Sequence, residues 1–389
     1  MLGGSMTDKI QRLIKYCQGI YNKEDGGLLY KKYLEDIKTI TPEELIIVEH
    51  EQLKMGMTSK DMLTFVDKLM NVFHESLSSY QLKNDVPEFL VIMIQENKAL
   101  EGILNDFKEV MKDMDQMTSV RTINFVNALK GYNNHMEKVE NILFSYLEKE
   151  EEHFNGLQIM WSLHDEIRLL MKELSHLLTT IEPKNLIVEI GRLYFLMYGA
   201  VQKQNLVLFP VSMKRLTQEQ FTSMHQESFD YGFSYIEAPE RIEKTKTLEM
   251  DQLNKVIQTE TGHLEIEILI SILNILPIDF TFVNEKDEVA YFNDSKERIF
   301  PRSSSIIGRN VRNCHPPESV HVVENILKAF RAGERDKAEF WIKMKGMMIY
   351  IYYLPIKDGN GNYKGTLEIS QEISGLRALE GEQRLLDWK

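Results

Sequence analysis

The spacing of apolar residues divides the chain into helical and strand-like regions. Between residues 85 and 235, apolar positions recur every three to four residues, as in "PEFLVIMIQENKALEGILNDFKEVM", which is the spacing of one helix face. The same spacing returns over about 119–150, 157–179 and 184–209. Four amphipathic helices of this length, joined by short connections, predict an antiparallel four-helix bundle.

Residues 7–80 predict a separate small domain of shorter helices. Thr41 is a candidate N-cap, and Glu44 follows it three residues later, which completes a capping box. Gly56 is expected to end the helix that begins there. The N-terminal half of the chain is therefore expected to be entirely helical.

The pattern changes after residue 235. Residues 236–262 are rich in charge and poor in apolar side chains, which predicts a linker. Within 263–389, apolar and polar residues alternate in five short runs, with a helical stretch at about 317–332 and a hairpin signal, "DGNG", before the last run. This order predicts an α+β domain, and "GLRALEGEQRLLDWK" predicts a helix at its end. The whole chain is thus expected to be multidomain.

Two segments of the predicted bundle resemble each other. "HMEKVENILFSYLEK" (135–149) aligns with "AVQKQNLVLFPVSMK" (200–214), with Phe144 opposite Phe209. His135 then lies opposite Ala200. The alignment suggests that two helix pairs of the bundle are related.

Composition narrows the classes of function. The chain has 389 residues and a net charge of −13, which argues against sequence-independent binding to nucleic acid. Its two cysteines cannot build a disulfide framework, and no apolar run is long enough to span a bilayer. The start of the chain has no signal-peptide pattern, so we expect a cytoplasmic protein. Phosphate-binding loops, nucleophile elbows and HExxH motifs are missing from the sequence, and we therefore expect no enzyme.

Several phrases resemble one bacterial protein family. The stretch from "FNDSKERIF" to "DKAEFW" and the ending "QEIS" resemble a PAS domain, whose sheet has five antiparallel strands. "ENKALEGIL", "ENILFSYLEK" and "MWSLHDEIR" resemble a hemerythrin-like HHE cation-binding domain. In that family the two domains follow an N-terminal domain of unknown function, number 438, so the resemblance covers nearly the whole chain.

The resemblance implies a bundle that holds two irons with histidines and carboxylates from all four helices. The positions that keep such side chains here are His135, Glu140 and His164. Other ligand positions of the family hold Val91, Val139, Ala200, Gln204 and Asn205. His153 and Asp165 are further candidates. We therefore expect a degenerate metal site without a di-iron centre, and a single weakly bound metal is the alternative.

The phrase "NCHPPESVH" carries the candidate chemistry of the PAS region. His315 or His321 is a candidate axial ligand of haem, and Cys314 is a candidate thiolate ligand or redox switch. In the alternative interpretation, two prolines restrict the backbone and start a helix, so the histidines have structural roles. The two interpretations differ in whether these side chains face the cavity that PAS domains enclose.

The sequence thus predicts a regulatory protein that senses a small ligand, haem included, in a PAS cavity. We expect no output domain after the PAS region, so the signal is expected to pass through contacts with a separate, unidentified protein partner. A homodimer through the PAS domain or the end helices is a further expectation, and neither nucleic acid nor membrane is an expected partner. One alternative is an iron protein in oxygen or nitric-oxide sensing or in iron-centre repair, and another is a dimerisation scaffold.

Overall fold

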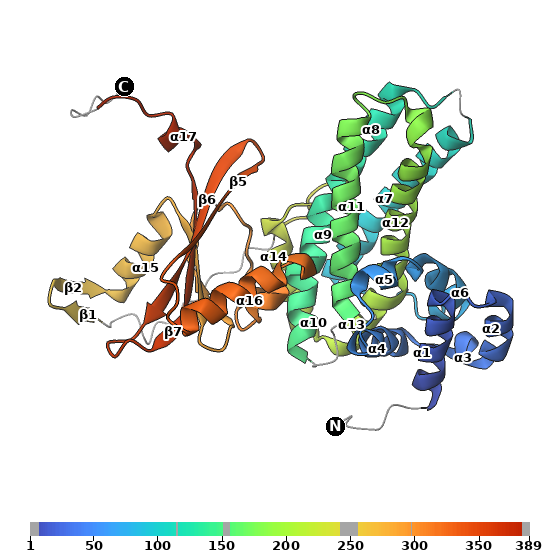
Figure 1. Ribbon diagram of the computed structural model, residues 1–389, viewed down its shortest axis with the longest axis horizontal. Helices are drawn as coiled ribbons and strands as arrows, with labels where there is room; N and C mark the ends of the chain where they lie inside the picture. Colours follow the sequence, from blue (N-terminus) through green and yellow to red (C-terminus); the bar gives the residue numbers. More distant parts are fainter. Residues whose placement is uncertain (1–7, 114–115, 151–155, 242–255, 297, 383–389) are drawn as a thin grey trace. The chain divides into compact units, whose positions relative to one another are not determined.

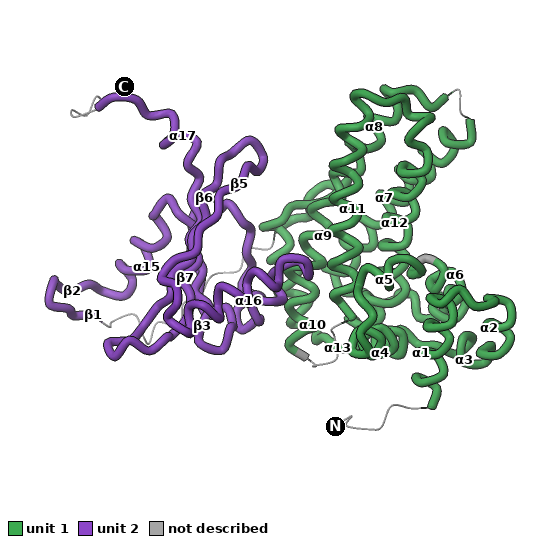
Figure 2. Tube along the Cα trace, in the orientation of Figure 1, with its two compact units in different colours: residues 1–242 green, residues 243–389 purple. Residues whose placement is uncertain are grey.

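The structure is a computed structural model that describes residues 8–113, 116–150, 156–241, 256–296 and 298–382. The chain divides into two compact units, residues 1–242 and 243–389 (Figure 2). Each unit is described by itself. Within the described ranges, none of the helices combines the length and the apolar character that a membrane crossing requires.

Short helices open the first unit (Figure 1). They are α1 (Asp8–Tyr21), α2 (Gly26–Lys32), α3 (Leu34–Thr39), α4 (Pro42–Lys54), α5 (Ser59–Leu63) and α6 (Val66–Ser78). Thr41 and Glu44 form the predicted capping box at the start of α4, and Gly56 follows the end of this helix with a φ of +94°. Local signals in the sequence therefore set both ends of α4.

Four long helical segments follow and lie side by side (Figure 1). The first is α7 (Glu88–Lys112), and the third is α11 (Leu157–Leu177). The second contains α8 (Ser119–Leu129), η1 (Lys130–Tyr132), α9 (Asn133–Lys138), η2 (Val139–Leu143) and α10 (Phe144–Glu150). The fourth contains η4 (Pro183–Leu186), α12 (Ile187–Lys203), η5 (Gln204–Leu208) and α13 (Phe209–Arg215), and α14 (Gln218–Glu227) and η6 (Ser228–Asp230) complete the unit. The predicted four-helix arrangement is confirmed.

The short helices and the bundle share one hydrophobic core, which contains Cys17 and Phe73 as well as Leu100 and Leu163. A buried ion pair also joins the two parts, since Nζ of Lys203 on α12 lies 2.6 Å from a carboxylate oxygen of Glu49 on α4. Residues 7–80 are thus part of the first unit. Their resemblance to a separate family domain stays a prediction.

The two resembling segments of the bundle share an unusual backbone feature. Both η2 and η5 are π-helical turns, and they occupy the same position in the aligned segments 135–149 and 200–214. A π turn widens the helix by one residue and is frequent near functional sites. The internal resemblance in sequence is therefore also a resemblance in backbone structure.

The second unit contains two sheets. The small one pairs β1 (Val256–Thr259) with β2 (Gly262–Glu265) and leads into α15 (Ile266–Ile275). The large one has five antiparallel strands in the order β4-β3-β7-β6-β5. Its strands are β3 (Asp279–Asn284), β4 (Val289–Phe292), β5 (Ala338–Met344), β6 (Met347–Lys357) and β7 (Tyr363–Glu372). Between β4 and β5 lie η8 (Ser304–Ile306), η9 (Val311–Cys314) and α16 (Pro317–Arg331).

The ends of this unit differ from the expectation. Strand β1 lies inside the range expected to be a linker, 236–262, of which residues 242–255 lie outside the described residues. The expected end helix is limited to α17 (Ser374–Arg377) within the described residues, because the chain leaves the helical conformation before Gly381, which has a φ of +68°. Residues 383–389 lie outside the described residues.

Candidate functional site

A buried cluster of charged side chains lies inside the bundle. His135 on α9 places Nδ1 2.7 Å from Oε2 of Glu96 on α7, and Nζ of Lys138 lies 2.5 Å from Oε1 of the same carboxylate. All three side chains are fully buried. Burial alone would raise the pKa of Glu96, but the hydrogen bond with His135 and the charges of His135 and Lys138 hold it below its usual value.

A second carboxylate has a similar arrangement. Oε1 of Glu140, on η2, lies 2.8 Å from Nδ1 of His164, and Oε2 accepts a hydrogen bond of 2.8 Å from Nη2 of Arg168. Burial would raise the pKa of Glu140, but the charge of Arg168 and the contacts with His164 lower it. Each buried carboxylate therefore has one histidine and one basic side chain beside it. Burial lowers the pKa of Lys138, although Glu96 opposes the effect.

Gln204 on η5 connects the two halves of this network. Its Oε1 lies 2.7 Å from Nε2 of His135, and its Nε2 lies 3.5 Å from Nε2 of His164. With Oε1 as the acceptor, both ring nitrogens of His135 face an acceptor oxygen, one from Gln204 and one from Glu96, an orientation assigned from the hydrogen-bond network. Burial lowers the pKa of His164, although Glu140 opposes the effect, so its neutral ring accepts from the amide.

These atoms form a charge network and do not match the donor set of a two-iron centre. A ligating histidine needs a free nitrogen lone pair, but Nε2 of His135 and Nε2 of His164 both face the amide of Gln204. The side chains of the described residues form no group of three histidine, cysteine, aspartate or glutamate residues that could hold a metal ion. Asp165 contacts Arg168, with Nη1 at 3.3 Å from Oδ1, and His153 lies outside the described residues.

Sequence reasoning found His135, Glu140 and His164 but missed Glu96 and the cations. A signal for the cations was present, because Lys138 follows His135 by three residues and Arg168 follows His164 by four. That spacing places each cation on the same helix face as the histidine it follows.

The depressed pKa of His164 predicts a dependence of stability on pH. Because the unfolded chain takes up the proton first, the free energy of unfolding should fall as the pH drops below about 6.5 toward the folded-state pKa. The variant His164→Asn, which keeps an amide donor for Glu140, should show a smaller fall between about pH 7 and pH 5. Urea unfolding followed by circular dichroism over this range tests the prediction, and an unchanged slope would contradict it. Burial lowers the pKa of His225 as well, so the slope should decrease without vanishing.

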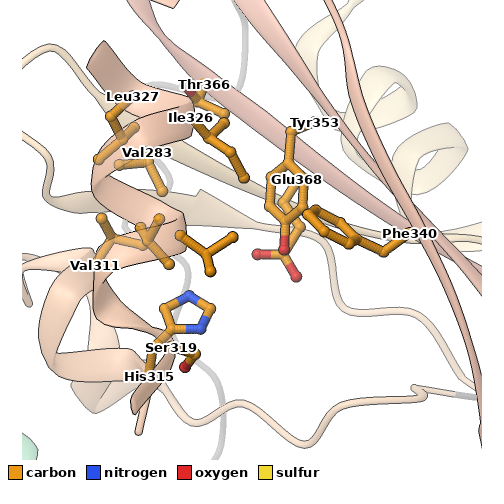
Figure 3. Close-up of a pocket in the computed structure, with 12 residues that line it drawn as sticks. Val283, Val311, His315, Ser319, Ile326, Leu327, Phe340, Tyr353, Thr366 and Glu368 are labelled. Atoms are coloured by element: carbon orange, nitrogen blue, oxygen red, sulfur yellow. The ribbon is translucent and has the colours of Figure 1, made fainter. Parts of the chain in front are cut away.

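The second unit contains a cavity of about 300 Å³ between α16 and the large sheet (Figure 3). Most of its lining is apolar. The lining residues are Val283, Val311, His315, Ser319, Val322, Val323, Ile326, Leu327, Phe340, Tyr353, Thr366 and Glu368. An apolar pocket with a few convergent polar groups is the usual form of a small-molecule site.

The three candidate residues of "NCHPPESVH", namely Cys314, His315 and His321, lie in different surroundings. His315 lines the cavity, and burial lowers the pKa of its ring. His321 is exposed on α16. Cys314 is half-buried beside the core cluster of Val283 and Val289, and it is not among the residues that line the cavity. The structure therefore separates these side chains, and His315 is the one that a ligand in this cavity would contact.

Two family models match the chain. The hemerythrin HHE cation binding domain matches residues 89–202, and a PAS domain matches residues 269–374. The chain thus contains a hemerythrin-type domain followed by a PAS domain, a combination that indicates a sensor or regulatory protein. Neither match extends into residues 1–88, so the third domain of the resembling family stays a prediction.

Several solved structures are similar to part of the chain. A C-terminal domain from Streptococcus mutans is 35% identical, covers 33% of this chain and 99% of its own, and has a TM-score of 0.32. The PAS domain of a protein from Colwellia psychrerythraea is 19% identical, with coverages of 28% and 98% and a TM-score of 0.24. The PAS domain of BvgS from Bordetella pertussis is 16% identical, with coverages of 28% and 86% and a TM-score of 0.24. No curated protein matches the chain.

Proposed function

We propose that the protein senses a small molecule in the cavity of its PAS domain and passes the signal to a separate protein partner. The observation that carries the proposal is the cavity itself, which has a mostly apolar lining and five polar side chains, among them His315, Tyr353 and Glu368. A ligand that binds there touches both α16 and the sheet. It therefore favours conformations with one particular distance between α16 and the sheet. The surface that binds the partner changes as this distance changes.

The size of the cavity favours a ligand smaller than haem. Small-molecule sites span roughly 300–1,000 Å³, and this cavity is at the lower end of that range. At the density of liquid water, about 300 Å³ holds roughly ten water molecules, which corresponds to a ligand of about ten to fifteen non-hydrogen atoms. Haem has about three times as many atoms, so we propose that His315 contacts a small organic ligand.

We also propose that the hemerythrin-type bundle works without iron. In this proposal Lys138 and Arg168 supply the positive charge that metal ions supply elsewhere, and each already contacts a buried carboxylate. Binding two irons would leave these cations buried beside metal ions of the same sign, which is costly. Two irons per chain with the absorption of an oxo bridge, in protein produced with ample iron, would contradict this part of the proposal.

Filling the cavity should abolish ligand binding while the fold persists. Val323 lines the cavity from α16, and the variant Val323→Phe places a ring in the space that the ligand needs. A ligand present at about 100 times its Kd should raise the Tm of the wild-type PAS unit by about 5 °C or more. The same ligand should leave the Tm of Val323→Phe unchanged. A thermal-shift screen with haem, flavins and small metabolites, followed by native mass spectrometry, measures both.

The control is Val320→Phe, which makes the same substitution on the same helix at a residue that does not line the cavity. This variant should keep the ligand response. If no compound of the screen stabilises the wild type, and a pull-down recovers no partner, the sensor proposal loses its support. If a ligand stabilises both valine variants equally, the ligand binds outside this cavity.

A further inference from the structure

We propose, on the basis of the proposed sensor function, that the ligand of the PAS cavity is a small organic amine with an apolar body. The proposal rests on three of the five polar side chains at the cavity wall: a carboxylate beside two aromatic rings, a tyrosine hydroxyl and an imidazole. The other two, Ser319 and Thr366, already form hydrogen bonds within the protein. Figure 3 shows Glu368, Tyr353 and Phe340 together on one side of the cavity and His315 on the other.

Glu368 is the strongest hydrogen-bond acceptor of the cavity. Of the described residues that line it, Glu368 alone has a carboxylate side chain. Nη2 of Arg302 contacts both carboxylate oxygens, at 3.4 and 3.3 Å, which are long distances for a charged pair. An ionised carboxylate has about four acceptor positions, so Glu368 keeps capacity for a donor from the ligand.

The aromatic rings beside this carboxylate also favour a cation. Phe340 on β5 and Tyr353 on β6 form an edge-on pair, with ring centroids 6.0 Å apart and an interplanar angle of 79°. A ring face attracts an ammonium group within about 6 Å of its centroid, most strongly where water is excluded. The carboxylate and the rings therefore act on the same ligand group, and both repel a carboxylate at that place.

The other two polar groups are available to a ligand. Within the described residues, neither the hydroxyl of Tyr353 nor the ring of His315 has a hydrogen-bond partner. Burial lowers the pKa of His315, so the ring is neutral at physiological pH and does not repel an ammonium group. It offers one further donor and one acceptor to a second polar atom of the ligand.

The remaining lining determines the body of the ligand. Val283, Val311 and Leu327 belong to the core of the unit and present methyl groups to the cavity. The volume of about 300 Å³ suits a phenyl ring or a branched alkyl group on a short chain. A polyamine or a sugar would leave polar atoms without partners against this wall.

The test compares three compounds with one body and different head groups. They are 2-phenylethylamine, 2-phenylethanol and phenylacetate, titrated into the full-length chain and followed by calorimetry. The amine should bind about tenfold or more tightly than phenylacetate, because a carboxylate at Glu368 attracts an ammonium group and repels another carboxylate. The alcohol should lie between them. Tighter binding of phenylacetate than of the amine, or binding of none of the three compounds, would overturn the inference.

Variants test whether Glu368 causes the preference for the amine. Glu368→Gln should reduce the affinity for the amine about tenfold and the affinity for the alcohol by less than about threefold. Glu334→Gln makes the same change at an exposed residue and should leave all three affinities unchanged. Arg302→Gln removes the cation that competes for Glu368 and should raise the affinity for the amine, a gain that a folding defect cannot imitate. Equal losses for amine and alcohol in Glu368→Gln would also overturn the inference.

These outcomes separate the amine inference from the sensor proposal. If the amine series fails but another compound stabilises the wild type and not Val323→Phe, the cavity is a sensor site with a different ligand class. If Val323→Phe responds to every ligand as the wild type does, the cavity is not the site, and both proposals fail.

Discussion

Replacing Glu96 by glutamine is expected to lower the free energy of unfolding of the helical unit by about 3–5 kcal/mol. The substitution keeps the shape of the side chain but removes its negative charge. Lys138 then stays buried without a counter-charge, and Nδ1 of His135 loses its carboxylate partner. Urea unfolding of the full chain, followed by circular dichroism at 222 nm, measures the loss.

Two further variants decide whether the loss comes from the buried charge. Glu109→Gln, on the exposed face of the same helix, breaks only a surface pair with Lys112 and should change the free energy by less than about 1 kcal/mol. The double variant Glu96→Gln, Lys138→Met removes both charges and should recover a large part of the loss. A loss below about 1 kcal/mol for Glu96→Gln would show that the network contributes little to stability.

Replacing Lys203 by methionine should also cost about 3–5 kcal/mol of unfolding free energy. Its ammonium group is the partner of Glu49, and both side chains are almost fully buried between α4 and α12. Burial raises the pKa of Glu49 even though Lys203 opposes the effect. Without the lysine, the carboxylate is expected to take up a proton instead of staying charged.

The pH dependence of Lys203→Met tests whether Glu49 takes up a proton in this variant. A carboxyl group whose folded-state pKa is raised stabilises the fold below the unfolded pKa and loses that effect as the pH rises through the folded pKa. The deficit of Lys203→Met should therefore be smaller at about pH 5 than at about pH 8. Lys214→Met, which removes a surface partner of Glu43, is the control, and its small deficit should not depend on pH in this way. A deficit that is the same at both pH values would contradict the prediction.

Much of the fold was predictable because its signals are local. The apolar spacing of "PEFLVIMIQENKALEGILNDFKEVM" predicts α7, and the capping box at Thr41 predicts the start of α4. The alternation in β6 predicts that Ile349 and Ile351 share one side of the strand, and the structure buries both. The π turns were not predictable, because one extra residue in a turn leaves the apolar pattern almost unchanged. Strands β1 and β2 were missed because their side chains are mostly exposed and show no alternation.

The buried network of the bundle could be predicted only in part from the sequence. His135 and His164 were identified as inward-facing polar residues, and the structure buries both. Their partners come from other helices, since Glu96 is 39 residues from His135 and Glu140 is 24 residues from His164. Which side chains meet across helices depends on how the helices pack, and spacing along the chain does not contain that information.

The residues that line the PAS cavity could also be predicted only in part from the sequence. The prolines of "NCHPPESVH" correctly predicted the start of α16, at Pro317. Spacing placed His321 near the edge of the buried helix face, but the structure leaves it exposed and directs His315 into the cavity. His315 precedes the helix in an extended conformation, with a φ of −127°, so helical periodicity does not determine its direction.

The paired π turns at 139–143 and 204–208 have a consequence for how this chain tolerates changes of length. Deleting one residue from either turn can restore α-helical hydrogen bonding without breaking the helix. The extra residue is taken up within the wide turn, so the parts of the helix on its two sides would keep their relative orientation. A deletion from a regular α-helical part of the same segment would instead rotate one side by about 100° relative to the other. Single-residue deletions at 139–143 and 204–208 that keep Glu140 and Gln204 should thus be tolerated better than deletions elsewhere in the same segments.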